Sequence, residues 1–360
     1  MRAAEIIIIG GGVMGLAIAT ELAARGRSVQ IISRHFEEAA LHAAAGMLAP
    51  RAEKLPVGPL QDLCLRSRDM YGNWASKLTQ LTGMDTGYWP CGILAPVFKE
   101  DAPALNDPAW LSQAEIKRYQ AGLGPDVIGG WWYPGDGQVD NRQLAQTLLQ
   151  AAKMSGVDIR EGVKVEALTT HKARITELVT DMGPLQAETY VLAAGSWSAS
   201  LLPLPVHPVK GQMLSLQMPV LPGDPLPIEQ VLFGPGIYLV PRKDGRLVVG
   251  ATVEQVGYQP HITPAGLNEL LSKATRLFPA VQDWPLLDTW WGFRPGTPDE
   301  LPHLGPTPFS NLHLAVGHYR NGILLAPITA QLLADGICEG RYDAFVENFN
   351  CERFHTVSSS

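Results

Sequence analysis

Residues 10–15, Gly10-Gly11-Gly12-Val13-Met14-Gly15, lie between a short apolar run and a helical pattern. The preceding residues 5–9 predict a buried strand, residues 16–25 predict a helix, and residues 29–32 predict a second strand. In such a unit, free backbone N–H groups and the positive end of a helix dipole lie beneath a pyrophosphate. The segment therefore predicts a dinucleotide-binding lobe built on a parallel sheet.

Each glycine of this segment has its own expected role. Gly10 permits the turn after the strand, and Gly12 lets a phosphate approach the backbone. Gly15 lets the helix and the strand pack closely, and Val13 and Met14 belong to the same binding turn. Because the GxGxxG pattern also occurs in turns that bind nothing, the strand before it and the helix after it are what favour a dinucleotide.

The end of the second strand departs from the usual pattern of such a lobe. An acidic residue that binds a ribose hydroxyl is common there, but this chain has Ser33 and Arg34. Three interpretations stay open. The pair binds the extra phosphate of NADP, the backbone and the serine hydroxyl hold the ribose, or the pair lies in solvent at the end of the strand.

Length and composition indicate a soluble protein with two lobes. The chain has 360 residues, more than one core usually holds. The early apolar run at residues 6–9 is far too short to span a bilayer, and no basic leader precedes it. A net charge of −7 without a basic cluster argues against nucleic acid or an anionic membrane as partner and favours a small molecule.

The cysteines and histidines give no sign of a metal site or of thiol redox chemistry. Cys64, Cys91, Cys338 and Cys351 lie far apart without CxxC or zinc spacing, and the nine histidines lack an HExxH arrangement. We therefore expect no metal and a reducing, cytoplasmic location.

A run of small residues follows the first two strands. Residues 36–47, which end in Ala43-Ala44-Ala45-Gly46-Met47, match neither a strand nor a clear amphipathic helix. Small side chains let the backbone approach a flat ligand, but they suit close helix packing equally well. Residues 61–82 then show helical spacing with one apolar face.

An inserted lobe is expected next. Six prolines interrupt residues 88–137, between short strand-like runs. Asp140 and Gln143 predict a capping box at the start of a helix. Residues 212–291 show mostly strand patterns, with a hairpin around the turn at residues 243–245.

Later segments return to the first lobe. Residues 190–195 predict a buried strand with a glycine turn that extends the first sheet. Residues 317–322 form a turn before a predicted helix over residues 325–337, with Pro327 in its first turn. The N-terminus of this helix would offer fixed N–H dipoles to a negatively charged cofactor.

These patterns together predict an α/β fold, α+β overall. A Rossmann-type nucleotide-binding lobe would carry an inserted, mainly antiparallel β substrate lobe. The first lobe would comprise residues 1–85, 140–212 and 291–352, the second residues 86–139 and 213–290, and residues 353–360 would form a tail.

Six stretches in order are more specific than the glycine motif alone. They are residues 10–15, 43–48 with 52–53, 238–243, 250–252, 292–297 and 317–327. Over nearly its whole length the chain resembles the FAD-dependent D-amino-acid oxidase family, and most closely its glycine oxidase branch, which acts in thiamine biosynthesis.

The resemblance implies a noncovalent FAD and oxidation of glycine and other small amines to the imine, which gives glyoxylate and ammonia. Dioxygen would accept the electrons and become hydrogen peroxide. In thiamine synthesis the imine would feed the thiazole-forming enzyme, which the resemblance implies as a partner. The family also implies a homo-oligomer, as a tetramer.

The resemblance further assigns roles to single residues. Arg294 would bind the substrate carboxylate, a task for which a guanidinium offers two parallel hydrogen bonds. Tyr238 would donate to the same carboxylate, and Arg320 would lie near the flavin. Without the family, a structural salt bridge explains Arg294 equally well. The residues implied to contact FAD are Gly10, Gly12, Val13, Met14, Gly15, Ser33, Arg34, Ala44, Ala45, Gly46, Met47, Val165, Ala194, Gly195, Trp197, Arg294, His318, Arg320, Asn321, Gly322 and Ile323.

Departures from the family pattern keep alternatives open. Gly236 and Val253 stand where a relative has histidine and methionine, so the preferred amine stays open among glycine, sarcosine and small D-amino acids. An NADP-dependent dehydrogenase would use Ser33 and Arg34 instead. A nonenzymatic cofactor-binding partner of the thiazole-forming complex would not need Arg294.

Overall fold

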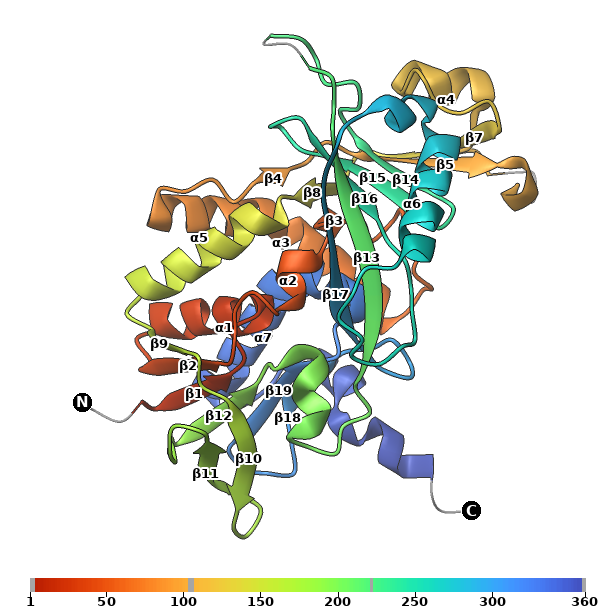
Figure 1. Ribbon diagram of the computed structural model, residues 1–360. Helices are drawn as coiled ribbons and strands as arrows, with labels where there is room; N and C mark the ends of the chain where they lie inside the picture. The colour runs from red at the N-terminus through yellow and green to blue at the C-terminus, as the bar shows by residue number, and fades with distance from the viewer. Residues whose placement is uncertain (1–3, 103–106, 221–222, 358–360) are drawn as a thin grey trace.

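The computed structural model describes residues 4–102, 107–220 and 223–357. Its main elements are two large sheets (Figure 1), and residues of both sheets line one cavity. The first sheet has six strands in the order β18-β19-β12-β1-β2-β9. Neighbouring strands are parallel except for β18 and β19. Their bounds are β1 Ile6–Ile9, β2 Val29–Ser33, β9 Asp158–Glu161, β12 Thr189–Leu192, β18 His303–Pro306 and β19 Leu312–Val316. The predicted buried strands at residues 5–9, 29–32 and 190–195 therefore lie side by side in one sheet.

Helices cover one face of this sheet, and a small hairpin covers the other (Figure 1). Helix α1, Val13–Ala24, packs against α5, Asn141–Met154, and α7, Gly322–Glu339, while α3, Pro59–Thr82, packs across α5 and α7. On the opposite face, β10, Val165–Thr170, and β11, Ile175–Thr180, form the hairpin. Alternate β1 residues contribute to the two apolar cores on these faces, as expected for a strand buried on both sides.

Two local predictions were wrong in detail. Helix α7 begins at Gly322, three residues before the predicted start, so Pro327 lies inside the helix rather than in its first turn. The predicted capping box of α5 is half formed. Asp140 accepts hydrogen bonds from the N–H groups of Arg142 and Gln143, but its own N–H donates to the Gly87 carbonyl, which leaves nothing for Gln143 to cap.

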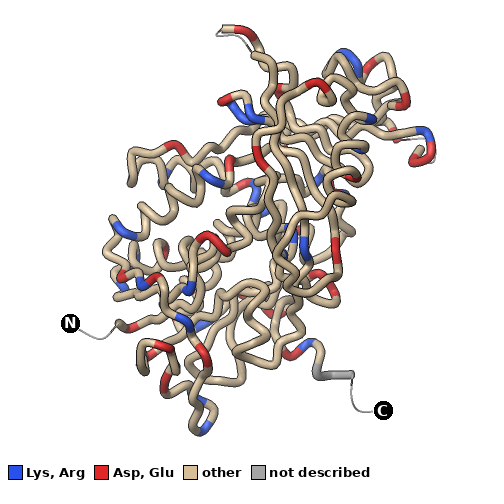
Figure 2. The backbone as a smooth tube through the Cα atoms, viewed as in Figure 1, with Lys and Arg blue, Asp and Glu red and all other residues tan. Residues whose placement is uncertain are grey.

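The segment at residues 319–339 is long and apolar enough to cross a membrane by length and composition, but 72% of its most apolar window is buried inside the fold. It is the central helix of the first core. Acidic and basic residues are scattered along the chain in both lobes, without a long run of one sign (Figure 2).

The second sheet has eight strands in the order β17-β13-β16-β15-β14-β5-β7-β6 and is antiparallel except between β14 and β5. The predicted hairpin is present as β15 and β16. The strand bounds are β5 Ile93–Phe98, β6 Leu111–Ser112, β7 Val127–Tyr133, β13 His207–Gln217, β14 Val231–Gly234, β15 Ile237–Pro241, β16 Arg246–Gly250 and β17 Leu286–Gly296. Helix α6, Pro264–Leu277, packs on one face, and the short α4, Gln113–Tyr119, lies at the edge.

A small three-stranded sheet and α2, Ala40–Ala43, lie where the two lobes meet. Its strands are β3 Met47–Leu48, β8 Gly137–Val139 and β4 Tyr88–Trp89, in the order β3-β8-β4. The expected lobe boundaries at residues 212 and 291 fall within β13 and β17, which pair along nearly their full length. We propose that the lobes divide at the outer ends of these strands, near residues 206 and 297. Residues 358–360 of the expected tail lie outside the described part.

Arg242 connects the second lobe to the first. It follows β15, it is 3% exposed, and its Nε lies 3.6 Å from the Asp140 carboxylate at the start of α5. Burial lowers the pKa of Arg242 to about 10, against the influence of Asp140. Burial also opposes ionisation of Asp140, but Arg242, Arg246 and the α5 N–H groups hold its pKa below the ordinary value. The guanidinium donates to the side chain of Gln138, the Val139 carbonyl at 3.4 Å, the Ala45 carbonyl at 2.7 Å and the Asn141 side chain at 3.3 Å.

We expect Arg242→Met to lower the free energy of unfolding by about 3 to 5 kcal/mol, because several buried acceptors lose their donor and the Asp140 carboxylate loses one of its two arginine neighbours. Chemical denaturation of the FAD-loaded protein measures the change. Lys243→Met is the matched control, since Lys243 is exposed next to Arg242, and it should stay within about 0.5 kcal/mol of wild type. Equal effects of the two substitutions would contradict the role of Arg242 between the lobes.

Candidate active site

A cavity of about 660 Å³ runs between the two lobes and collects most of the predicted site residues. This volume is typical of ligand and cofactor sites. Two predicted residues do not line the cavity. Gly15 packs beneath the glycine turn, where an added Cβ would lie 1.9 Å from the Gly10 carbonyl oxygen, and Asn321 is buried beside α7. The predicted residues that do line it are Gly10, Gly12, Val13, Met14, Ser33, Arg34, Ala44, Ala45, Gly46, Met47, Val165, Ala194, Gly195, Trp197, Tyr238, Arg294, His318, Arg320, Gly322 and Ile323.

The glycine turn opens one part of the cavity. Gly10 has φ of +116°, and a Cβ there would lie 2.4 Å from the Ala193 carbonyl oxygen, so only glycine suits this position. Gly12 precedes α1, and within the described residues no side chain caps this helix end. Its first N–H groups therefore face the cavity, as a bound pyrophosphate requires.

The ends of β2 and β10 form the far part of the cavity. Ser33 is 6% exposed at the end of β2, and Val165 begins β10. Arg34 pairs with Glu38 and lies 5.3 Å from the centre of the Trp197 ring, so its guanidinium already has a carboxylate and an aromatic face as partners. This arrangement does not favour the extra phosphate of NADP as the role of Arg34.

The small-residue run forms a wall of the cavity and is held through its backbone. The Val139 N–H donates to the Gly46 carbonyl at 2.8 Å, Arg242 donates to the Ala45 carbonyl, and the Trp290 indole donates to the Ala43 carbonyl at 3.1 Å. Gly46 has φ of +74°, and a Cβ there would lie 2.0 Å from the Val139 carbonyl oxygen. The small side chains therefore allow close approach to this wall from both sides, by neighbouring backbone on one side and by a ligand in the cavity on the other.

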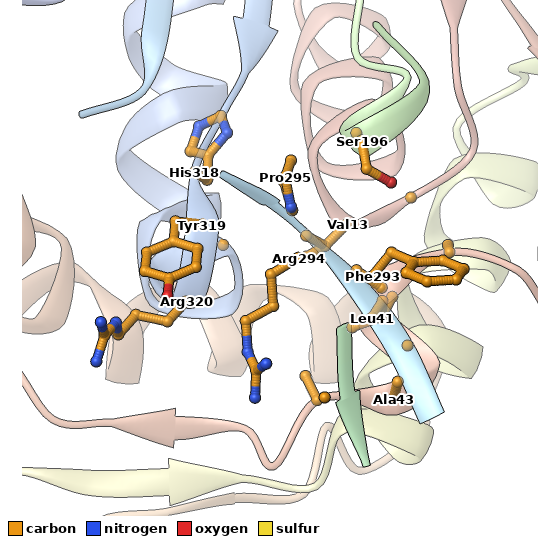
Figure 3. A pocket seen from close by; sticks show the side chains of 18 of the residues that line it. Val13, Leu41, Ala43, Ser196, Phe293, Arg294, Pro295, His318, Tyr319 and Arg320 are labelled. Carbon is orange, nitrogen blue, oxygen red and sulfur yellow. The ribbon is translucent and has the colours of Figure 1, made fainter. Parts of the chain in front are cut away.

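Arg294 and Tyr238 lie together at the second sheet. Arg294 and Phe293 project to opposite sides of β17 (Figure 3). The Arg294 Nη1 donates to the Thr252 carbonyl at 3.2 Å, and its guanidinium occupies space that a Cβ on Gly211 would fill. Burial raises the pKa of the Tyr238 hydroxyl, and the nearby Arg294 opposes this in part, so the hydroxyl stays protonated and can donate.

Arg320 and His318 precede α7 on the other side of the cavity. The side chains of Arg320 and Arg294 extend from different elements toward the same side (Figure 3). Arg320 is exposed and lies 3.7 Å from the Glu300 carboxylate. His318 is buried, burial lowers its pKa to about 3, and its Nε2 lies 3.2 Å from the Thr329 hydroxyl. His318 is therefore neutral and cannot supply a positive charge at neutral pH.

Several cavity residues were missed by sequence reasoning. Glu53 belongs to one of the quoted stretches, but its sequence spacing assigned it no role. An acidic residue among small and apolar residues could have indicated that it lines the cavity. Ser196 follows the predicted glycine turn at residues 190–195, and its hydroxyl is buried without a hydrogen-bond partner. Thr252 belongs to the quoted stretch at residues 250–252 but was given no role, and Glu254 and Lys164 come to the cavity only through the fold.

The residues present suit FAD. The glycine turn and the uncapped end of α1 would receive the pyrophosphate, and the small-residue wall would lie against a flat ring. At the Gly317–Gly322 turn, the start of α7 points its N–H groups to the cavity, where an electron-rich ring would be stabilised.

Fold and site together define a flavin-dependent oxidoreductase of the two-lobed class. Residues 5–336 match the DAO family, described as FAD dependent oxidoreductase. The chain therefore belongs to this family, and the predictions of an α/β two-lobed fold, of an oxidoreductase and of FAD are confirmed. Noncovalent attachment stays a prediction. The NADP-dependent and nonenzymatic alternatives are not favoured.

Individual relatives agree with this assignment. The bifunctional protein ThiO/ThiG of Synechocystis is 58% identical over 99% of this chain and 55% of its own length. The glycine oxidase of Geobacillus kaustophilus is 35% identical over 95% of this chain and 94% of its own length. A crystal structure of glycine oxidase from Geobacillus kaustophilus gives a TM-score of 0.91 at 33% identity, covering 98% of this chain and 99% of that one. The chain thus spans little more than half the length of the first relative.

We expect Gly12→Ala to leave the thermal midpoint of the FAD-free protein unchanged but to weaken FAD binding about tenfold or more, or about 1.4 kcal/mol. The nearest atom to the new methyl would be the Ala39 Cβ at 3.7 Å, so the methyl has room in the protein but intrudes on the phosphate space. Fluorescence titration of the FAD-free protein with FAD measures the affinity. Gly15→Ala is the contrasting variant, since its Cβ meets the Gly10 carbonyl and should lower both quantities. Unchanged FAD affinity in Gly12→Ala would place the pyrophosphate elsewhere.

Proposed function

We propose that this chain oxidises glycine and other small amines with FAD and dioxygen. The products are the imine, which water converts to glyoxylate and ammonia, and hydrogen peroxide. The observation that carries the proposal is the pair Arg294 and Tyr238, which together offer donors for a carboxylate in the cavity shared with the cofactor turn. Relatives named glycine oxidase support the choice of substrate.

Arg294 binds the substrate carboxylate in this proposal. A guanidinium has five N–H donors, and within the described residues Arg294 hydrogen-bonds the Thr252 carbonyl and the Tyr238 hydroxyl. Its remaining donors are therefore available for two parallel hydrogen bonds, which fix both the position and the orientation of a carboxylate. The protonated Tyr238 hydroxyl adds a further donor.

The residues of the first lobe hold the cofactor. The turn at residues 10–14 receives the pyrophosphate, Ser33 and Val165 face the adenosine end, and residues 44–47 with the start of α7 face the ring. When bound, FAD supplies the two-electron acceptor that passes electrons on to dioxygen. The contribution of the protein is then to fix the amine in one orientation and to exclude water from it.

The wider setting follows from the relatives. The name ThiO/ThiG joins this kind of chain to a second part, which supports a thiazole-forming enzyme of thiamine synthesis as the consumer of the imine. We further propose a cytoplasmic homo-oligomer. Sarcosine and small D-amino acids are the nearest alternative substrates, since Gly236 and Val253 leave room at the cavity, where Gly236 is exposed beside Lys273.

We expect the purified protein to be yellow, to release FAD on acid precipitation and to lose its flavin absorbance when glycine is added without oxygen. With oxygen, glycine should give equal amounts of hydrogen peroxide and glyoxylate. The measurements are absorbance spectra before and after anaerobic glycine and coupled assays of both products. Reduction of the flavin by a hydroxy acid, and by none of the small amines, would replace the proposed reaction.

We expect Arg294→Leu to keep FAD but to lower kcat/KM for glycine by about 10² to 10³. Leaving a buried charge without its partner costs about 3 to 5 kcal/mol, at 1.36 kcal/mol for each factor of ten. A small amine without a carboxylate should lose much less, so the ratio of the two kcat/KM values is the quantity to compare. Arg66→Leu is the control, because Arg66 is a half-exposed arginine outside the cavity. Equal losses for both substrates would assign Arg294 to the fold, and Arg320 would be the next candidate.

A further inference from the structure

Glu53 is a carboxyl group in the cavity that the carboxylate clamp does not use. It follows the small-residue wall and lines the same cavity as Arg294 and Tyr238. The residue is half-buried, and its Oε2 atom is fully buried without a hydrogen-bond partner. An unpartnered buried carboxylate oxygen is costly, so a bound ligand with a donor is a physical reason for its presence.

The direction of Glu53 is fixed by its turn. Its N–H donates to the Ala49 carbonyl at 3.0 Å, and the next two N–H groups toward the N-terminus, at residues 51–52, donate to the Asp136 carboxylate at 3.1 and 2.9 Å. Asp136 is itself buried and paired with Arg68 at 3.3 Å. These contacts keep the side chain at the cavity instead of in solvent.

The other acidic residues of the cavity already have partners. Within the described residues, four carboxylates line it: Glu38, Glu53, Glu254 and Glu269. Glu38 pairs with Arg34, Glu254 with Lys210 at 3.1 Å, and Glu269 with Lys273 at 2.7 Å. Glu53 is therefore the one whose acceptor oxygens are available to a ligand.

Charged groups from several elements face Glu53. Burial raises its pKa to about 7, Arg320 and then Arg294 oppose this, and Asp136 and Glu300 add to it. The Tyr238 hydroxyl and the Cys64 thiol are further titratable neighbours, and burial raises the pKa of each. The carboxyl can thus gain and lose a proton near neutral pH.

We propose that Glu53 binds the amino group of the substrate and accepts its proton. An amino acid enters as a zwitterion, so Arg294 takes its carboxylate and Glu53 faces its ammonium. One proton then moves from the ammonium nitrogen to a Glu53 oxygen, which leaves a neutral amine and a neutral carboxyl group, with no change in oxidation state. The amine needs its free lone pair for oxidation. The inference rests on the proposed function, because it requires an amine substrate.

We expect kcat/KM for glycine to fall about tenfold per pH unit below about pH 7 in the wild type, because a protonated Glu53 cannot accept the proton. In Glu53→Gln the break near pH 7 should disappear, and the acid limb should extend to the higher pH at which the substrate amine itself loses its proton. Turnover then depends on amine that is already neutral in solution, so kcat/KM should be about 10² lower at pH 7 and rise with pH toward the wild-type value. Glu53→Asp should keep the acid limb at a reduced rate.

A binding measurement tests the same group without turnover. Glycolate has the carboxylate of glycine but a hydroxyl in place of the ammonium. Its dissociation constant, followed through the flavin absorbance, should rise with pH through about 7 in the wild type, because ionised Glu53 repels the anion and loses its proton donor. In Glu53→Gln it should be constant from about pH 6 to 8.

Glu347→Gln is the control, since it removes an exposed carboxylate outside the cavity. It should match the wild type in both measurements. A break near pH 7 that persists in Glu53→Gln, or glycolate binding in the wild type that does not change with pH, would overturn the role of Glu53. A wild type that oxidises no amine at any pH would instead overturn the proposed function, so the two failures are distinct.

Discussion

The cavity depends on one buried arginine. Because the site lies between two sheets, its shape is set by how the lobes are held together. Arg242 comes from the second lobe, yet its acceptors are the Ala45 carbonyl, the β8 segment and the start of α5. The same guanidinium therefore joins the lobes and fixes the wall on which a flat cofactor ring would lie. This arrangement links the stability of the fold to the geometry of the site.

The features that could be predicted from the sequence are those that depend on residues close together in the chain. The glycine turn, its strands and the hairpin at residues 243–245 depend on neighbours in the chain, and all were predicted. Arg242 and Asp140 are about a hundred positions apart, so no periodicity reveals their pairing. The expected lobe boundaries at residues 212 and 291 stay a prediction, and the pairing of β13 with β17 also joins residues that are far apart in the chain. The family resemblance brought Arg294 and Tyr238 to notice, but gave Glu53 no role.

The charges of the cavity suit a zwitterion better than an anion alone. Arg294 and Arg320 contribute two positive charges, and Glu53 lies among them with a carboxyl that titrates near neutral pH. A ligand with one charge of each sign can pair with Arg294 and Glu53 together, and it leaves no buried charge alone. A purely anionic ligand would face Glu53 with the wrong sign, and a simple cation would leave Arg294 unpaired.

Arg242 and Arg294 show how donor satisfaction separates a structural from a functional arginine. Arg242 is almost fully buried, and its Nη1 and Nη2 groups donate to acceptors from its own chain, so a ligand could bind them only by breaking the fold. Arg294 is half-buried, and within the described residues it hydrogen-bonds the Thr252 carbonyl and the Tyr238 hydroxyl, while Gly211 leaves space for its guanidinium. A guanidinium kept in a cavity with most of its donors unused gains its full set of partners only when a carboxylate arrives. The binding of that carboxylate is therefore favoured because it supplies acceptors for the Arg294 N–H donors that the fold leaves without partners.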